Sequence, residues 1–99
     1  MTDKYILEGH NPVICENLIE WAKWFEKSDR KVAKTKIKDV TISTVFLGIN
    51  HNFGEGKPIL FETMIFGGGL DGEMDRYSTW EEAEEGHKRW IKKIKELWR

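Results

Sequence analysis

The 99-residue sequence has a single cysteine, Cys15, only two prolines and no long apolar run. A lone cysteine excludes an intramolecular disulfide and any zinc site built on cysteine ligands. No stretch approaches the roughly 20 apolar residues that a membrane-spanning helix requires, and no signal-peptide pattern is present. We therefore expect an intracellular protein with no membrane partner.

An excess of either charge is also lacking, because 16 basic residues stand against 17 acidic ones and the formal net charge is −1. Nonspecific binding to duplex nucleic acid depends on a basic surface, so this composition argues against it. Tryptophan is abundant, with five residues in a chain short enough to form one domain over 1–99. Tryptophan suits cores, interfaces and stacking on planar ligands.

Apolar residues recur at helical spacing near both ends of the chain. We expect a first helix over 12–27, with Asn11 as its N-cap and Pro12 as its first residue. The second helix is expected over 79–98. Ser78 and Glu81 have the spacing of a capping box at its start.

Residues rich in β-branched and aromatic side chains lie between these helices and predict strands at 31–37, 39–49 and 58–66. A short edge strand is expected at 73–77. Consecutive strands with short connections favour an antiparallel meander. The sequence therefore predicts an α+β domain in which two amphipathic helices pack on one face of a three- to four-stranded antiparallel sheet.

The spacing of reactive residues does not indicate a catalytic or metal centre. The three histidines are not spaced as paired metal ligands, and no serine lies in a nucleophile elbow. The segment Gly54–Lys57 lacks the spacing and the following helix of a Walker loop. We predict no catalytic residue, no metal ligand and no cofactor.

A loop of roughly eight residues after the central strand is longer than a hairpin requires, and such loops often carry function. Together with polar residues that the fold needs least, it gives the candidate ligand-binding residues His51, Asn52, Gly54, Gly56, Glu62, Thr63, Arg76, Tyr77 and His87. Each has a structural alternative: the loop as a plain connection, Glu62 and Arg76 as an ion pair, and His87 as a hydrogen-bonded core residue.

Three segments, WAKWFEKSDRKVAKT (21–35), STVFLGINHNFGEGKPILFETMIFGG (43–68) and DRYSTWEEAEEGH (75–87), follow one another in a specific order. In this order they resemble a family of small uncharacterised proteins encoded by tailed phages and prophages. The resemblance implies a phage-type accessory protein in the host bacterial cytoplasm. It supplies no catalytic residues.

Compact phage proteins of this kind often disarm host defences, and several sequester signalling nucleotides as oligomers. By this analogy we expect a noncatalytic homo-oligomer that binds a small nucleotide-like ligand, with Arg76 and the glycine-loop amides as phosphate ligands. One alternative is a protein–protein inhibitor or assembly accessory that uses exposed tryptophans. Another is a small nucleotide hydrolase or lyase that uses His51 or His87 with Glu62.

Overall fold

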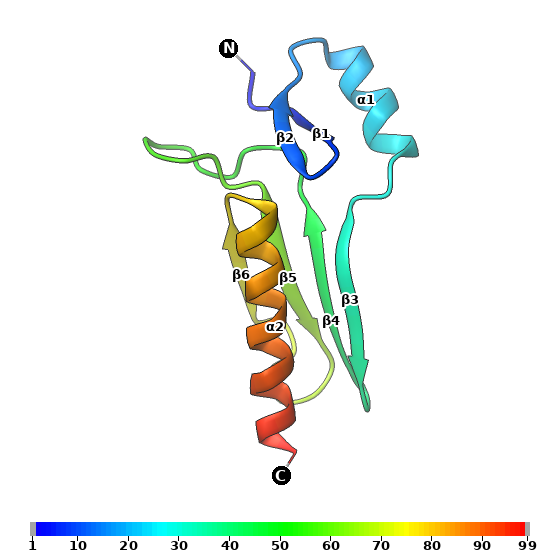
Figure 1. Cartoon of the computed structure of the whole chain (residues 1–99), viewed down its shortest axis with the longest axis vertical. Helices are drawn as coiled ribbons and strands as arrows, with labels where there is room; N and C mark the ends of the chain where they lie inside the picture. The colour runs from blue at the N-terminus through cyan, green and yellow to red at the C-terminus, as the bar shows by residue number, and fades with distance from the viewer. Residues whose placement is uncertain (1, 99) are drawn as a thin grey trace.

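The computed structural model describes residues 2–98, in which six strands and two helices follow one another (Figure 1). The elements are β1 (Tyr5–Glu8), β2 (Asn11–Ile14), α1 (Leu18–Lys27), β3 (Lys31–Ile37), β4 (Val40–Phe46), β5 (Phe61–Phe66), β6 (Met74–Tyr77) and α2 (Trp80–Leu97). No helix in this part of the chain is long and apolar enough to cross a membrane.

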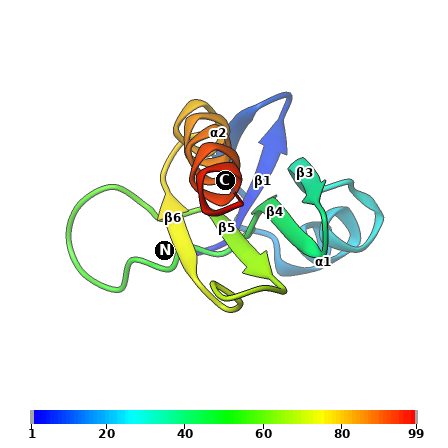
Figure 2. The same cartoon turned by 90° about the horizontal axis from the view of Figure 1, so that it is seen from below.

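The main sheet has four antiparallel strands in the order β3-β4-β5-β6. Helix α2 contacts all four strands. Viewed from below, it lies on one side of them (Figure 2). The α+β class predicted from the sequence is confirmed, and the sheet has the larger of the two predicted strand numbers.

The interior between α2 and the sheet has two apolar clusters separated by a polar layer. One cluster contains Val40, Ile42, Ile65, Trp90 and Ile94, and the other contains Phe46, Leu60, Phe61, Tyr77 and Ala83. Thr44, Thr63 and His87 occupy the intervening positions of β4, β5 and α2 and are buried. Because buried polar groups need partners, this layer constrains how α2 sits on the sheet.

The prediction of a helix starting at Pro12 is wrong. Asn11–Ile14 is instead strand β2, which pairs with β1 around a two-residue turn where Gly9 has a φ of 62°. Proline fits both a first helical turn and a short edge strand, and this ambiguity misled the prediction. The N-cap of α1 is Asn17, whose side chain accepts a hydrogen bond from the Glu20 amide at 3.0 Å.

Only α2 covers the sheet face, so the prediction that both helices pack there is wrong. Helix α1 lies against the β1–β2 hairpin at one end of the domain (Figure 1). Trp21 holds it there, because its indole Nε1 donates to the carbonyls of Tyr5 and Gly48, each at 3.1 Å. Gly48 is required at this contact, since its φ is 77° and a Cβ would lie 2.8 Å from the Phe25 ring.

The capping box of α2 lies one residue later than predicted. Thr79 is the N-cap and pairs with Glu82, and the Glu82 carboxylate accepts from the amides of both Ser78 and Thr79. These backbone donors lower the pKa of Glu82. The capping box starts one residue later because Tyr77 still belongs to β6, where its carbonyl accepts a hydrogen bond from the Leu60 amide. Ser78 therefore lies in the connection between β6 and α2.

Candidate binding face

The nine candidate residues lie in three separate places. His51, Asn52, Gly54 and Gly56 are in the loop between β4 and β5, which projects from one side of the domain (Figure 2). Glu62 and Arg76 lie on the sheet face away from α2. Thr63 and Tyr77 are buried between the sheet and α2, and His87 lies on the buried side of α2. The fold therefore does not bring these residues together into one pocket.

The polar side chains of the long loop are used largely to hold the loop itself. The Asn50 side chain accepts from the amides of Asn52 and Ile59, at 2.8 and 2.9 Å. The Asn52 side chain donates to the carbonyls of Glu55 and Lys57 and accepts from the Gly54 amide. These bonds account for the loop's asparagines structurally.

His51 and the tip glycines lie in the projecting loop, apart from the other candidate residues. The Nδ1 atom of His51 lies 2.8 Å from the Ile49 carbonyl oxygen, so one ring nitrogen is already engaged. Gly54 and Gly56 are exposed at the tip on either side of Glu55. Phe53, with 90% of its surface exposed, is the most prominent apolar group there.

A chain of hydrogen bonds crosses the interior from β3 to β6. His87 is its centre, with Nε2 at 2.9 Å from the Thr35 hydroxyl and Nδ1 at 2.7 Å from the Thr44 hydroxyl. Thr44 bonds Thr63, and the Tyr77 hydroxyl donates to Thr63 at 3.0 Å. The structural interpretation of His87 as a hydrogen-bonded core residue is therefore confirmed.

Burial favours the neutral forms of His87 and Tyr77, the two titratable groups in this series of hydrogen bonds. It lowers the pKa of the His87 imidazole and raises the pKa of the Tyr77 hydroxyl, the latter against an opposing hydrogen bond with Thr63. A neutral imidazole bonded on both sides by hydroxyls is a stable structural element. It is also shielded from any ligand in solvent.

The predicted pairing of Glu62 with Arg76 is confirmed. The two residues are direct cross-strand partners on β5 and β6, and Arg76 Nε donates to the Glu62 carboxylate at 3.0 Å. The Arg76 side chain keeps 40% of its surface exposed, whereas that of Glu62 keeps 14%. The pair thus lies on the solvent-facing side of the sheet, opposite α2.

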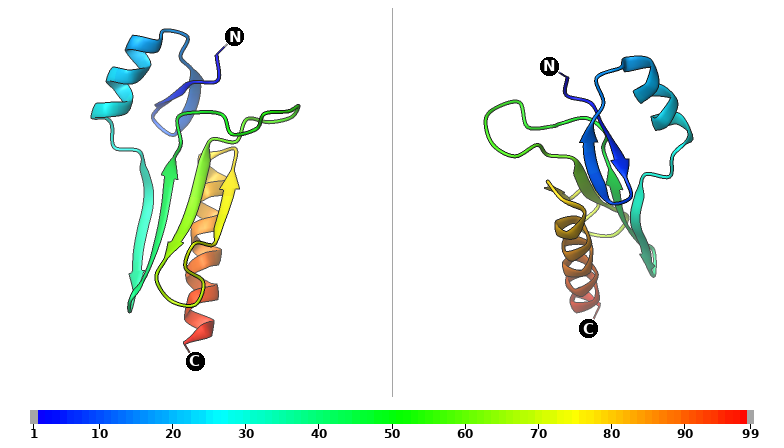
Figure 3. Two further views of the ribbon diagram at one scale, coloured as in Figure 1. Left: turned by 180° about the vertical axis from the view of Figure 1, so that it is seen from behind. Right: turned by 45° about the horizontal axis from the view of Figure 1, so that its top comes forward.

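The strand register places further side chains around this pair, on a surface that we call the open face. Its cross-strand rows are Lys36, Thr41 and Phe66; then Lys34, Ser43, Met64 and Met74; then Lys31, Val45, Glu62 and Arg76. On β4 and β5 these residues alternate with the buried ones under α2, so they point the other way. On β3 a bulge between Lys31 and Ala33 brings Lys31 to the same face as Lys34 and Lys36. Seen from behind, neither helix covers this side of the strands (Figure 3, left).

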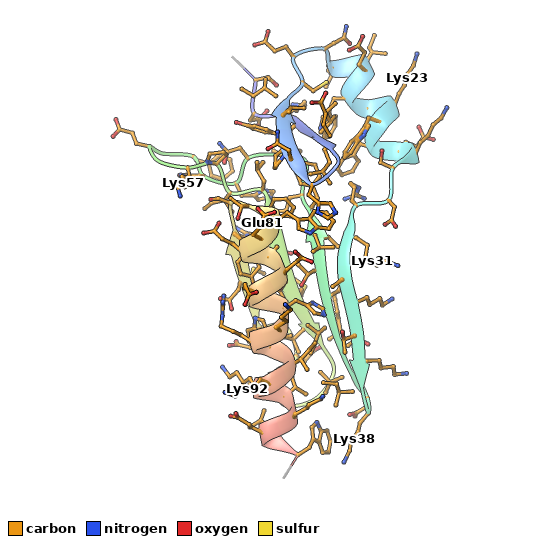
Figure 4. All side chains as sticks on the ribbon, in the orientation of Figure 1. Lys23, Lys31, Lys38, Lys57, Glu81 and Lys92 are labelled. Atoms are coloured by element: carbon orange, nitrogen blue, oxygen red, sulfur yellow. The ribbon has the colours of Figure 1, made fainter. Side chains whose placement is uncertain are left out.

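The open face combines unpaired cations with exposed apolar groups. Within residues 2–98, none of the three lysines has a carboxylate within ion-pair distance. The labelled Lys31 extends from β3 away from α2 (Figure 4). Phe66 and Met74 are 49% and 42% exposed, which is high for residues in a central and an edge strand.

The alternative sites predicted from the sequence are not assembled. Glu62 and His87 lie on opposite sides of the sheet, so they do not face a common substrate position. Of the five tryptophans only Trp98 falls in the exposed class, which leaves few for an interface. Among residues 2–98, no three histidine, cysteine, aspartate or glutamate side chains group closely enough to hold a metal ion.

Comparison of the chain with protein-family models, curated proteins and solved structures gave no match. The resemblance to phage proteins stays a prediction.

The sequence pattern did not single out the lysines of β3 and the apolar residues opposite them as candidates. A signal was present, since Lys34 and Lys36 alternate with half-buried positions along a predicted strand. What it lacked was the register, which alone shows that Lys36 and Phe66 share a row.

Proposed function

We propose that this protein is a noncatalytic binding protein that recognises a phosphate-bearing, nucleotide-like ligand on the open face. The observation that carries the proposal is the composition of the three cross-strand rows. Each begins with a lysine that has no carboxylate partner among residues 2–98, and the rows continue to Phe66, to Met64 and Met74, or to Arg76. Cations beside exposed apolar groups suit a ligand with both phosphates and bases.

The charge of the open face supports an anionic ligand. Its four cationic side chains, Lys31, Lys34, Lys36 and Arg76, stand against one carboxylate, that of Glu62. The whole chain carries a formal net charge of −1, so the open face differs in sign from the chain as a whole. A local field of this kind attracts anions and orients their approach.

Arg76 has the geometry for a phosphate ligand. Its Nε is used by Glu62, and within the described residues its two terminal amino groups have no hydrogen-bond partner. Guanidinium groups can bind phosphate through two parallel hydrogen bonds. The Glu62 contact holds the guanidinium in place while those donors stay available to a ligand.

The apolar part of the open face suits a planar base. Phe66 presents an exposed ring, and the methionines of the middle row are polarizable groups that pack well against aromatic surfaces. Bases stack on aromatic side chains largely independently of their identity. Phosphate contacts and stacking would therefore act together at neighbouring rows.

The resemblance to phage proteins suggests the biological setting of this binding. We propose that binding sequesters a nucleotide-like signal of host defence in the bacterial cytoplasm, without turnover and in a homo-oligomer. The separation of His87 from Glu62 supports binding over catalysis.

Thermal unfolding with cyclic, linear and ADP-ribose-derived nucleotides tests this proposal. A ligand that binds only the folded state raises the unfolding temperature. At a ligand concentration of about 100 times Kd, the free energy of unfolding increases by about 2.7 kcal/mol. We expect Lys34→Glu and Arg76→Gln to reduce the shift. Lys23→Glu, an exposed lysine on α1, is the matched control and should leave it unchanged (Figure 4).

Three results would overturn the proposal. They are the absence of a shift with any nucleotide or short single-stranded oligonucleotide, recovery of a chemically altered nucleotide after denaturation, and loss of binding in His51→Ala while the open-face variants bind normally. The last result would place the ligand at the loop, as first predicted from the sequence.

A further inference from the structure

We propose, building on the function proposed above, that the ligand is a single-stranded nucleic acid whose phosphates follow the lysines of β3 and whose bases lie across β4 and β5. The inference rests on how the charged and apolar groups are distributed over the open face. Cations line one edge along a strand, and the apolar groups lie one or two strands further in.

The distance that the three lysines span along β3 favours a polymeric ligand. Lys31 and Lys36 lie on β3, and their partners on β4, Val45 and Thr41, are four residues apart, which corresponds to about 13 Å along a strand. A mononucleotide carries its phosphates at one end and can reach the lysine of one row. A single strand presents a phosphate with every nucleotide and can engage Lys31, Lys34 and Lys36 together.

The shape of the open face favours a polymer as well. Small ligands bind tightly where a cavity encloses most of their surface. Four cavities of about 250–370 Å³ are formed elsewhere, at the foot of α2, on its outer side and near its N-terminus. None of these includes a lysine of β3. An open sheet surface gains its affinity from many contacts along an extended ligand.

A single strand fits this surface better than a duplex. Only unpaired bases can lie flat on Phe66, whereas the bases of a duplex are stacked on one another. Duplex grooves admit a helix or a two-stranded ribbon, and the middle of a four-stranded sheet face cannot enter them.

Fluorescence anisotropy tests the inference by measuring the binding of labelled single-stranded DNA and RNA. Oligonucleotides of about 10 nucleotides are suitable, because this length lies within the range of single-strand sites. With three phosphates engaged, log K should fall against log salt with a slope of about −2 between roughly 50 and 200 mM salt. Lys34→Gln should reduce that slope by about 0.7. The DNA and RNA arms show whether the 2′-hydroxyl contributes.

Phe66→Ala should weaken binding roughly 5- to 150-fold with the salt slope unchanged, because it removes stacking and no charge. Phe53→Ala is the matched control, since Phe53 is an exposed phenylalanine on the distant loop tip. Thermal unfolding verifies that each variant folds. If Phe66→Ala does not fold, Phe66→Leu keeps an apolar side chain and still removes the ring.

Several outcomes would overturn the inference. Mononucleotides that compete as well as oligonucleotides would overturn it and leave the proposed function standing. Duplex that binds as tightly as single strands would overturn it, as would polyglutamate competing equally well or Phe53→Ala having the larger effect. If neither nucleotides nor oligonucleotides bind, the inference and the proposed function both fail.

Discussion

Nδ1 of His87 on α2 lies 2.7 Å from the hydroxyl oxygen of Thr44 on β4, inside the domain and between its two apolar clusters. The other ring nitrogen bonds Thr35, so both sides of the imidazole are engaged. This arrangement fixes the rotation of α2 on the sheet. It also makes the stability of the domain depend on the charge of one histidine.

The domain should lose stability as the pH falls below about 6.5. Burial lowers the pKa of His87 in the folded state, while the unfolded chain keeps the ordinary value near 6.5. Below that value the unfolded state binds more protons, so the free energy of unfolding decreases until the folded-state pKa is also passed. Urea unfolding of the wild type and His87→Gln from pH 7.5 to 5 checks this.

His87→Gln should be less stable than the wild type at neutral pH and show a weaker pH dependence in this window. The residual slope reports the other titratable groups, which both proteins share. An equal slope in both proteins would contradict the assignment to His87.

Gly86→Ala should destabilise the domain by about 1–3 kcal/mol, although alanine is the better helix former by about 1 kcal/mol. The reason is that a Cβ at this position would collide with the Tyr77 ring. Chemical unfolding measures the change. In a Tyr77→Ala background the same substitution should become neutral or stabilising, and an unchanged cost there would rule out the collision as its cause.

Thr79→Ala should cost about 1 kcal/mol, the usual value for losing an N-cap side chain, because its hydroxyl accepts from the Glu82 amide at 3.1 Å. Ser78→Ala should cost only a few tenths, since Ser78 contributes its backbone amide to the box. The free energies of unfolding of the two single variants show whether Thr79 or Ser78 is the N-cap. A larger cost for Ser78→Ala would restore the cap predicted from the sequence.

Glu62→Gln should strengthen the binding of phosphate-bearing ligands and slightly lower stability. The change removes the only carboxylate among the cations of the open face. Losing its ion pair with Arg76 should cost at most about 1 kcal/mol, as for other solvent-accessible pairs. Binding titrations and unfolding curves report the two effects separately. Weaker binding by Glu62→Gln would instead mean that Glu62 contacts the ligand or positions Arg76 for it.

Local pattern determined much of this protein. The periodicity of α2, the limits of β3, the pairing of Glu62 with Arg76 and the inward position of His87 all follow from residues near one another in sequence or on neighbouring strands. These features depend on helical and strand geometry, which short segments encode. The N-terminal hairpin was missed because two four-residue strands carry little periodicity and Pro12 fits either element.

Only the tertiary structure decided where α1 lies and which side chains share the open face. The contact of Trp21 with the Gly48 carbonyl joins residues 27 positions apart, and amphipathicity does not say which apolar surface a helix will cover. Likewise, Lys36 and Phe66 meet through the pairing of three strands, and a one-residue slip would move one of them to the other side of the sheet. The sequence by itself determined α2, the strands of the main sheet and the charges that they carry. The register and docking of those elements decided which groups lie together on the open face.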